Sequence, residues 1–245
     1  MKVDFIECCD CVEGMKSLPD GCIDLTVTSP PYDNLRTYNG YSFDFESVAR
    51  ELYRVTKNGG VVVWVVGDQT VKGSETGTSF KQALFFMETG FNLHDTMIYQ
   101  KSGVSYPDST RYHQQFEYMF VFSKGKPKAI NLIADRKNKY TGTVGGNKRG
   151  GLCKRGEYGR RFNVWYYPNG KHNTTKDLDA FKHPAVFPEQ LAYDHIVSWS
   201  NEGDIVLDPF IGSGTTAKMA YKAGRHYIGF DISEEYCDIS RARIV

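Results

Sequence analysis

The sequence predicts an α/β protein: one mostly parallel, seven-stranded sheet with helices on both faces. Two observations lead to this prediction. Short apolar runs alternate with segments of helical periodicity, and the last two runs each end in an acidic residue, Asp208 and Asp231. An acid at a strand's carboxyl end lies where open α/β sheets bind their ligands. The expected strands lie near residues 3–7, 23–28, 60–66, 93–100, 116–123, 204–208 and 226–231.

Helical periodicity appears between these strands. The run "FDFESVARELYRVTKNGG" predicts a helix that ends at Gly59 and Gly60, with Val48, Leu52 and Val55 on one face. A second helix is expected over residues 78–89. A third is expected to begin near Pro188 in "FPEQLAYDHIVSWS", with Leu191, Ile196 and Val197 facing inward, and a fourth near Thr215.

The bulk properties favour one core in a soluble protein. The 245 residues are enough for one large domain or a domain with an insertion. The chain has no apolar run of 18 residues, and the start "MKVDFIECCD" lacks the pattern of a signal peptide, so a soluble intracellular protein with no membrane contact is expected. The six cysteines do not form two CxxC pairs, which predicts reduced thiols and no metal site.

A basic segment interrupts the sheet pattern. Between Lys124 and Lys182 lie 15 of the 30 Lys and Arg residues but only four of the 29 acids, which leaves 15 bases against 25 acids in the rest of the chain. The segment is rich in glycine and contains Tyr158, Phe162 and Trp165. This composition indicates a surface that neutralises phosphates and stacks on bases, although a solvated loop without a partner fits the charge equally well. An insertion over 126–180 is therefore expected.

The first motif is "TSPPY", which follows the apolar run "IDLTV". Pro30 and Pro31 cannot continue a sheet ladder, and each restricts the residue before it. The motif therefore forms a rigid strand tip with a hydroxyl at Ser29, a carbonyl at Pro30 and an aromatic face at Tyr32.

The second motif is "DPFIGSGTT", residues 208–216, which leads from strand 204–208 into a helix. Gly212, Gly214 and Ala217 with Asp231 downstream satisfy the pattern of a dinucleotide-binding turn. A nicotinamide cofactor is disfavoured, because the Asp208 carboxylate would face a pyrophosphate and only 28 residues follow Ala217.

"TSPPY" early, a basic insertion in the middle and "DPFIGSGTT" late together resemble the β group of DNA amino-methyltransferases, whose Rossmann-like fold is circularly permuted. The resemblance covers nearly the whole chain outside the insertion. It implies a catalytic and cofactor-binding domain over 1–125 and 181–245, and a target-recognition domain over 126–180. It also implies S-adenosyl-L-methionine as cofactor and double-stranded DNA as substrate. A homodimer and a cognate restriction endonuclease are further expectations, and so is a cytoplasmic protein that a prokaryotic cell or a phage encodes.

The resemblance also implies a set of site residues. The implied catalytic residues are Ser29, Pro30, Pro31 and Tyr32. The implied cofactor-binding residues are Asp10, Cys11, His183, Pro184, Ala185, Val186, Phe187, Asp208, Pro209, Phe210, Gly212, Ser213, Gly214, Thr215, Thr216, Asp231 and Ile232. The expected DNA-binding residues are Lys148, Arg149, Lys154, Arg155, Arg160 and Arg161. For His183 a packing role is an equal alternative. Glu117 and Lys124 are weaker site candidates, and Gly67, Asp68 and Gln69 lie at the same expected edge without an assigned role.

The residue types suit transfer of a methyl group to an exocyclic amine. Such an amine is a weak nucleophile, because its lone pair is delocalised into the base; acceptance of its two protons by Ser29 and the Pro30 carbonyl would localise that pair. Methylation of a ring carbon would need a thiol beside the base, and this motif has none. Ser29 and the run "FPE" at 187–189 favour cytosine N4 by family resemblance. Adenine N6 is the near alternative, and a catalytically inactive DNA-binding homologue is the more distant one.

Overall fold

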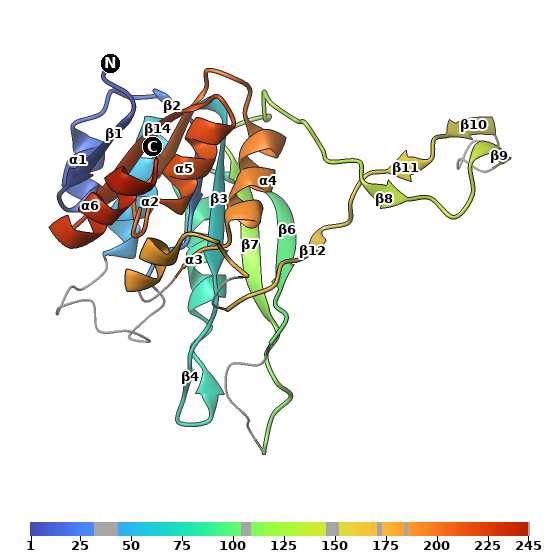
Figure 1. The fold of residues 1–245 in the computed structure, drawn as a ribbon, viewed down its shortest axis with the longest axis horizontal. Helices are drawn as coiled ribbons and strands as arrows, with labels where there is room; N and C mark the ends of the chain where they lie inside the picture. Colours follow the sequence, from blue (N-terminus) through green and yellow to red (C-terminus); the bar gives the residue numbers. More distant parts are fainter. Residues whose placement is uncertain (32–43, 104–108, 146–151, 171–172, 184–185, 245) are drawn as a thin grey trace.

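The computed structural model describes residues 1–31, 44–103, 109–145, 152–170, 173–183 and 186–244. The chain places a central sheet between two helical layers (Figure 1). Its strands are β1 (Phe5–Cys8), β2 (Ile23–Thr28), β3 (Thr56–Val66), β4 (Thr70–Val71), β5 (Ser74–Glu75), β6 (Asn92–Gln100), β7 (Phe116–Ser123), β8 (Arg136–Lys137), β9 (Gly142–Gly145), β10 (Leu152–Arg155), β11 (Tyr158–Gly159), β12 (Val164–Tyr166), β13 (Ile205–Asp208) and β14 (His226–Asp231). Its helices are α1 (Cys11–Lys16), α2 (Phe45–Val55), α3 (Thr78–Thr89), the 3-10 helix η1 (Leu178–Lys182), α4 (Glu189–Trp199), α5 (Thr215–Lys222) and α6 (Glu234–Arg243).

The main sheet has the order β1-β14-β13-β2-β3-β7-β6-β12. All seven predicted strands are present, and the predicted α/β fold is confirmed. The sheet has an eighth strand, β12, which the sequence reading missed because it is only three residues long and lies inside the basic insertion. The sheet is mixed, since β7 runs antiparallel to both β3 and β6.

One helix boundary was predicted wrongly. Helix α2 ends at Val55, and the chain enters β3 directly at Thr56, four residues before the expected stop at Gly60. The predicted inward face is correct, because Val48, Leu52 and Val55 are fully buried. The Thr56 hydroxyl donates to the Leu52 carbonyl (2.6 Å) and caps the helix, so the two glycines are not needed to end it.

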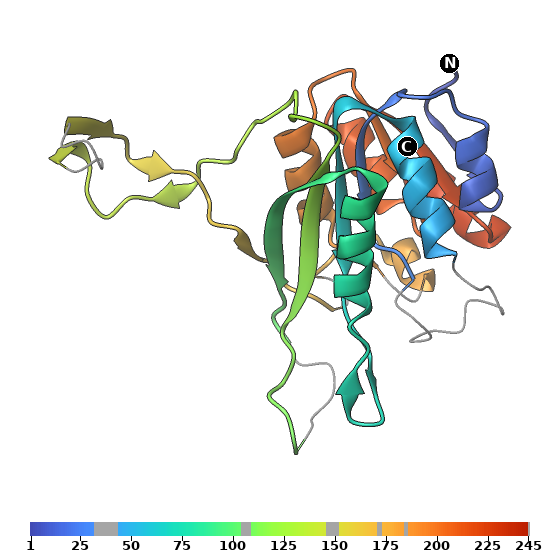
Figure 2. The same ribbon diagram turned by 180° about the vertical axis from the view of Figure 1, so that it is seen from behind.

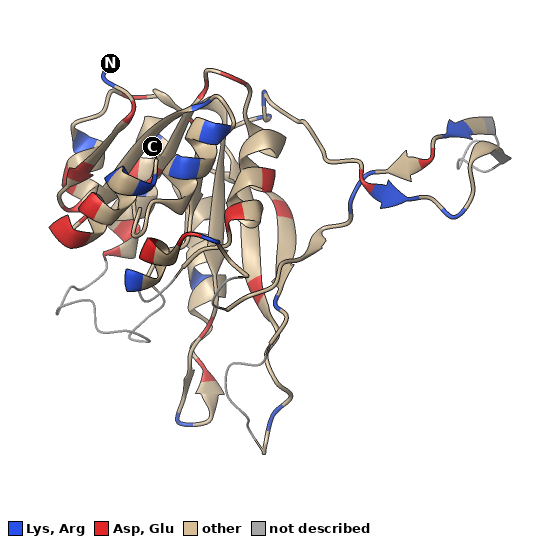
Figure 3. Ribbon diagram, viewed as in Figure 1, with Lys and Arg blue, Asp and Glu red and all other residues tan. Residues whose placement is uncertain are grey.

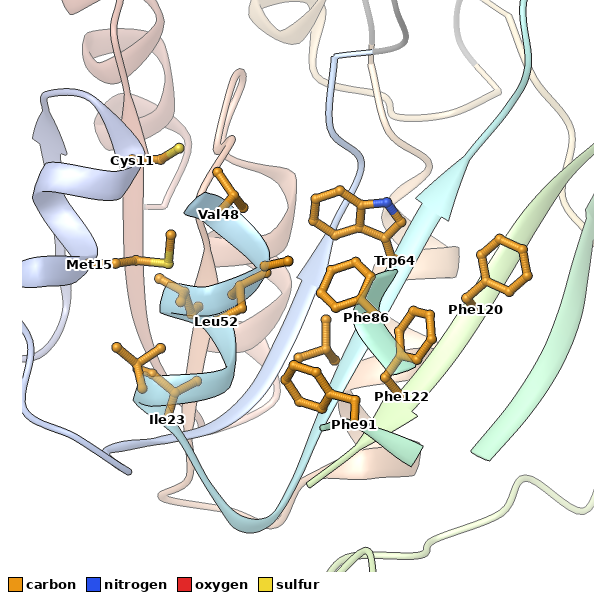
Figure 4. Packing of buried hydrophobic residues seen from close by; sticks show 14 of the residues in the cluster. Cys11, Met15, Ile23, Val48, Leu52, Trp64, Phe86, Phe91, Phe120 and Phe122 are labelled. Atoms are coloured by element: carbon orange, nitrogen blue, oxygen red, sulfur yellow. The ribbon is translucent and has the colours of Figure 1, made fainter. Parts of the chain in front are cut away.

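Two hydrophobic layers hold the sheet. On one face α1, α2 and α3 pack over Trp64 and the aromatic cluster of Phe86, Phe91 and Phe122 (Figure 2, Figure 4). On the other face α4 and α5 cover Leu25, Val63 and their neighbours. Alternate residues of β3 face opposite layers, as the two-residue period of a strand requires. The core therefore keeps the strand ends, and any side chains on them, in fixed positions.

The order of the central strands creates a switch point. From β13 the chain crosses through α5 to β14 on one side, whereas from β2 it crosses through α2 to β3 on the other. Strands β13 and β2 are neighbours and parallel. Their carboxyl ends therefore border the crevice in which open α/β sheets bind ligands.

The basic insertion forms an arm that projects from the body. Strands β8 to β11 form two short antiparallel ladders far from the sheet, and the arm returns through β12 beside β6 (Figure 1). Lys and Arg predominate over acids along it (Figure 3). Across the described residues, no helix is long and apolar enough to cross a membrane.

Candidate active site

The two sequence motifs meet at the switch point. Register pairs of β2 and β13 join Leu25 to Val206 and Thr26 to Leu207. Just beyond these pairs, the Thr28 hydroxyl donates to Asp208 Oδ1 across 2.6 Å. The proline motif and the glycine turn therefore begin at the same rim of the sheet. Thr28 itself was not predicted; its place just before "SPPY" was the available signal.

Asp208 is a buried acceptor that joins the two motifs. It also accepts from the Phe210 backbone N–H (3.1 Å). Burial raises the pKa of Asp208 to about 6, and hydrogen bonds from Thr28, Thr216 and Phe210 oppose that rise. The Thr216 hydroxyl, on the first turn of α5, lies within hydrogen-bond reach of both Asp208 and the Val27 carbonyl (3.1 Å) and can donate its one proton to either. These contacts are internal to the fold, which gives Asp208 and Thr216 positions behind the site's surface.

The proline motif leaves the sheet at once, as expected. Ser29 is half-buried, Pro30 is buried and Pro31 is half-buried at the end of β2. The predicted stacking residue Tyr32 lies outside the described residues. The Ser29 hydroxyl and the Pro30 carbonyl therefore follow directly on the strand that neighbours Asp208.

The glycine turn and Asp231 form a second linked unit. Gly212 N donates to Asp231 Oδ2 (3.0 Å), and Ser233 N donates to Asp231 Oδ1 (2.9 Å). Burial raises the pKa of Asp231, while these backbone N–H groups lower it in part. The Ile232 N–H also lowers the pKa of Asp231. A carboxylate has about four lone-pair positions, so acceptor capacity is left for a ligand hydroxyl.

The glycines of the turn are required by their surroundings. Gly214 has φ +81°, and a Cβ there would lie 2.8 Å from the backbone of Ser240. Gly214 is also the N-cap of α5 and supplies no side-chain cap, so no cap side chain covers the first amides of that helix. Uncapped amides at a helix start suit an anionic group.

A layer behind the turn was missed by sequence reasoning. The Ser240 hydroxyl donates to the Gly212 carbonyl (2.6 Å), and the Arg243 guanidinium donates to the Ser213 carbonyl. Arg243 also holds Asp177 Oδ2 (2.7 Å) and Glu189 Oε1 (3.0 Å). Both residues lie on α6, and nothing in the run "DISRARIV" marks them, because their partners are far away in sequence.

The Arg243 cluster is almost closed to solvent. Only 2% of the Arg243 side chain is exposed. Burial alone raises the pKa of Asp177, but Arg243 and Lys218 outweigh it and hold that pKa below its ordinary value. The pKa of Glu189 is likewise lowered, because Lys218, Thr175 and Arg243 together outweigh the effect of burial. The cluster thus joins the glycine turn to the segment that follows the arm.

The remaining predicted cofactor residues lie around this unit. Asp10 caps α1 by accepting from Val12 N (2.9 Å), and Cys11 is buried. Because Cys8 pairs with Asp231 in the sheet, Asp10 follows a strand end beside that of Asp231. Ile232 is 45% exposed.

His183 lies between the turn and α6. Its ring packs edge-on against Tyr236 (4.5 Å between centroids) and would be 3.0 Å from a Cβ at Gly212. Val186 and Phe187 are half-buried, and Phe187 packs on the second core layer. Pro184 and Ala185 lie outside the described residues.

The structure separates Asp68 and the two weaker site candidates, Glu117 and Lys124. Asp68 accepts from Ser79 N (2.9 Å) and from the Ser79 hydroxyl (2.5 Å) and so caps α3. Glu117 pairs with Lys101 (2.5 Å) at the same edge as the two motifs. Lys124 lies at the opposite edge, because β7 is antiparallel to β3; it donates to the Tyr53 carbonyl (2.6 Å). Its weaker site assignment is therefore wrong.

The expected DNA-binding residues fall into two groups. Lys154 and Arg155 on β10, and Arg160, are exposed on the arm. Arg161 is at the root of the arm, where it pairs with Asp135 and with buried Asp194 (2.7 Å). Lys148 and Arg149 lie outside the described residues. Arg161 therefore joins the outgoing and returning segments of the arm to each other and to α4.

The sequence is similar to those of known DNA methyltransferases. The sequence profile of the DNA methylase family, named for N6 and N4 methyltransferases, matches residues 23–242. The chain is 64% identical to the orphan methyltransferase M.BamHII of Bacillus amyloliquefaciens, in a match that covers 94% of this chain and 91% of the relative. It is 29% identical to the type II methyltransferase M.MthZI of Methanothermobacter thermautotrophicus, with 94% and 73% covered.

Solved structures share the fold. PvuII DNA methyltransferase, which is cytosine-N4-specific, matches with a TM-score of 0.77 at 22% identity, over 100% of this chain and 87% of that one. TTHA0409 of Thermus thermophilus, in complex with S-adenosyl-L-methionine, matches with a TM-score of 0.69 at 23% identity, over 99% and 93%. With a family profile that spans most of its length and a relative at 64% identity, the chain belongs to the DNA methylase family of N6 and N4 methyltransferases.

Proposed function

We propose that this DNA methyltransferase transfers a methyl group from S-adenosyl-L-methionine to the exocyclic N4 amine of a cytosine that is extruded from double-stranded DNA. The observation that supports this most is the contact of Thr28 with Asp208, because it fixes the proline motif beside the glycine turn. A base amine at the first motif and a methyl donor at the second would then meet across the switch point.

The residues around the glycine turn fit the methyl donor. Asp231 would accept from the ribose hydroxyls beside the backbone N–H groups that it already holds, and Ile232, exposed next to it, would offer an apolar surface to the adenine. The uncapped start of α5 suits the carboxylate of the methionine part. The fold of TTHA0409 holds this same cofactor. When bound, S-adenosyl-L-methionine supplies an activated methyl group on a sulfonium.

Ser29 and Pro30 would act on the amine. The Ser29 hydroxyl oxygen and the Pro30 carbonyl would each accept a hydrogen bond from one N–H of the amine, which favours a tetrahedral nitrogen with its lone pair directed toward the glycine turn. When the N–C bond forms, the bond of the methyl group to sulfur would break with its electron pair left on sulfur, and one amine proton would leave to solvent. Both acceptors sit on a proline-restricted backbone, so their directions are set before the base arrives. Tyr32 would stack on the extruded base.

The choice of cytosine over adenine rests on two sequence features. Ser29 and the run "FPE" at 187–189 resemble cytosine-N4 enzymes, whereas adenine N6 is the alternative within the same fold. The exposed cations of the arm would hold the phosphates of the duplex. A homodimer and a cognate endonuclease stay predictions; the relative M.BamHII is named an orphan methyltransferase.

Nucleoside analysis tests the reaction. Duplex DNA is incubated with the protein and methyl-labelled S-adenosyl-L-methionine, digested to nucleosides and analysed by mass spectrometry. We expect labelled N4-methyl-2′-deoxycytidine from the wild type and none from Ser29→Ala. Labelled N6-methyl-2′-deoxyadenosine would show that adenine is the target base, and 5-methyl-2′-deoxycytidine would refute the amine mechanism. Binding of DNA without any transfer by the wild type would favour the inactive homologue.

A further inference from the structure

Two excursions leave the sheet at the same edge as the two motifs. One is the β4–β5 hairpin with its flanks, residues 67–77, between β3 and α3; the other joins β6 to β7 (Figure 1, Figure 2). The pairs of Val66 with Tyr118 and of Gln100 with Phe116 put both departures at one rim. The described parts used below are the hairpin 69–76 and the loop 109–115.

The roots of both excursions are anchored. At the hairpin, the Asp68 carboxylate accepts from the Ser79 backbone N–H in the first turn of α3. Thr76 N donates to the Gln69 carbonyl (2.9 Å). At the loop, Lys101 N donates to the Gln115 carbonyl (2.7 Å), and the Lys101 side chain pairs with Glu117 (2.5 Å). Only 16% and 15% of these two side chains are exposed, so the pair is largely shielded from water. The root contacts give Asp68 and Glu117 a role.

The hairpin tip has a defined shape and is joined to the loop. Lys72 and Gly73 have φ of +49° and +80°, as in the two-residue turn that suits a twisted hairpin. The Arg111 guanidinium donates to the Gly73 carbonyl and connects the two excursions. A guanidinium has five N–H donors, so Arg111 can hold Gly73 and contact a phosphate at the same time.

The outer side of this paired structure is polar and open to solvent. Lys72 and the run from Arg111 to Gln115 are exposed, and the Tyr112 side chain is fully exposed. The run presents a guanidinium, a phenol, an imidazole and two amides in sequence. Amides and guanidinium groups are the side chains that read base edges, and tyrosine can stack on a base.

We propose that the hairpin 69–76 and the loop 109–115 form a second DNA-contacting surface, which grips the duplex beside the extruded base. This inference rests on the proposed function. An extruded nucleotide stays bonded to its strand, so a base that reaches Ser29 keeps the duplex within about one nucleotide of this rim. Structures that project past the rim then meet the duplex. Because the surface has few cations, it contributes local contacts, whereas the basic arm supplies most of the salt-dependent affinity.

The test compares two variants with matched controls. Tyr112→Ala and Arg111→Ala remove exposed groups at the tip. Tyr221→Ala and Lys222→Ala remove exposed groups of similar kind at the end of α5, which lies at the opposite edge of the sheet. For each protein we measure DNA affinity by fluorescence anisotropy, cofactor affinity by calorimetry and the rate of methyl transfer. A 2-aminopurine beside the target base reports extrusion.

We expect Tyr112→Ala to bind duplex DNA about tenfold or more weakly, with a smaller 2-aminopurine signal and unchanged cofactor affinity. Arg111→Ala should also weaken DNA binding, and both controls should behave as the wild type. If both tip variants keep the DNA affinity and the 2-aminopurine signal of the wild type, the proposed surface is wrong. Methyl transfer by the wild-type protein in the same assay would still support the proposed function. Wild-type protein that transfers no methyl group would instead refute the proposed function, and the anisotropy comparison would still test the surface.

Discussion

The Thr28 hydroxyl donates to the buried Asp208 carboxylate across 2.6 Å, and this one bond joins segments that are 180 residues apart in the chain. On one side of it begins the proline motif, and on the other begins the glycine turn. Both follow parallel strands whose positions are set by the two core layers. The site's geometry is therefore a property of the sheet rather than of either loop alone.

Asp208 should make folding stability depend on pH. Its pKa is about 6 in the folded protein, against 3.8 for an ordinary aspartate, so the folded state binds the proton more tightly than the unfolded chain. The stabilisation by the protonated form is complete below about pH 4 and is lost as pH rises through about 6. We expect the free energy of unfolding of the wild type, relative to Asp208→Asn, to fall by on the order of 2–3 kcal/mol over this window. Urea titrations at several pH values measure it, and a difference that stays constant with pH would contradict the assignment.

Asp231→Ala should separate cofactor binding from DNA binding. The substitution removes the acceptors proposed for the ribose hydroxyls and releases the Gly212 amide. We expect S-adenosyl-L-methionine affinity, measured by calorimetry, to fall about 100-fold for two lost hydrogen bonds to a charged group, with DNA affinity unchanged. Glu202→Ala, an exposed acid in the turn before β13, is the control. Equal cofactor affinity in Asp231→Ala would sink the ribose assignment.

Tyr32→Ala should weaken the hold on the extruded base. Loss of stacking is expected to cost roughly 1–3 kcal/mol in binding of DNA that carries an unpaired target base. Cofactor affinity should stay at the wild-type value. Competition between paired and mismatched duplexes measures this, and a variant with no loss of preference for the mismatched target would rule out the stacking role.

The cations of the arm should differ in their effects: some should contribute to DNA binding and Arg161 to folding stability. Replacing Lys154 and Arg155 together by Ala should lower the slope of log affinity against log salt by about 2, since each phosphate contact contributes about 0.9. Arg161→Ala should leave the slope nearly unchanged but lower the free energy of unfolding by about 1–3 kcal/mol, because buried Asp194 loses its cationic partner and keeps only the hydrogen bonds from Tyr167 and Gln190. Equal salt slopes in the wild type and the Lys154/Arg155 variant would argue against phosphate contacts there.

Arg243→Met should loosen the glycine turn without unfolding it. Lys218 still pairs with Asp177 and Glu189 in this variant, but the Ser213 carbonyl loses its donor. We expect KM for S-adenosyl-L-methionine to rise about tenfold, with a smaller change in kcat at saturating cofactor. Arg241→Met, two residues away and exposed on α6, serves as control. A fall in kcat with KM unchanged would assign Arg243 another role.

Much of the fold follows from local sequence. The apolar runs of β2 and β13 and the helix 78–89 are strong local signals, and the structure has them within a few residues. Strand β12 is different, because three residues are too few to show the alternating hydrophobic pattern of a strand. Its pairing with β6 forms only in the folded chain. The direction of β7 was equally invisible, and this is why Lys124 was placed at the wrong edge.

The site was predictable where motifs reveal it and not where packing does. Ser29, Gly212 and Asp231 lie in short patterns at strand ends. Arg243 and Ser240 support the turn from a helix whose sequence is ordinary, and only the fold brings them within reach. For Arg161 the basic segment suggested a DNA contact, whereas the fold pairs this residue with two acids, Asp135 and Asp194.

A crystal structure with a methyl-free amine analogue of S-adenosyl-L-methionine and a duplex that carries the target site tests the central claim most directly. The account predicts ribose hydroxyls on Asp231, the amino-acid part at the glycine turn, and an exocyclic cytosine amine in contact with the Ser29 hydroxyl and the Pro30 carbonyl. An analogue bound away from the glycine turn, or a target base whose amine lies far from Ser29 and Pro30, would contradict it.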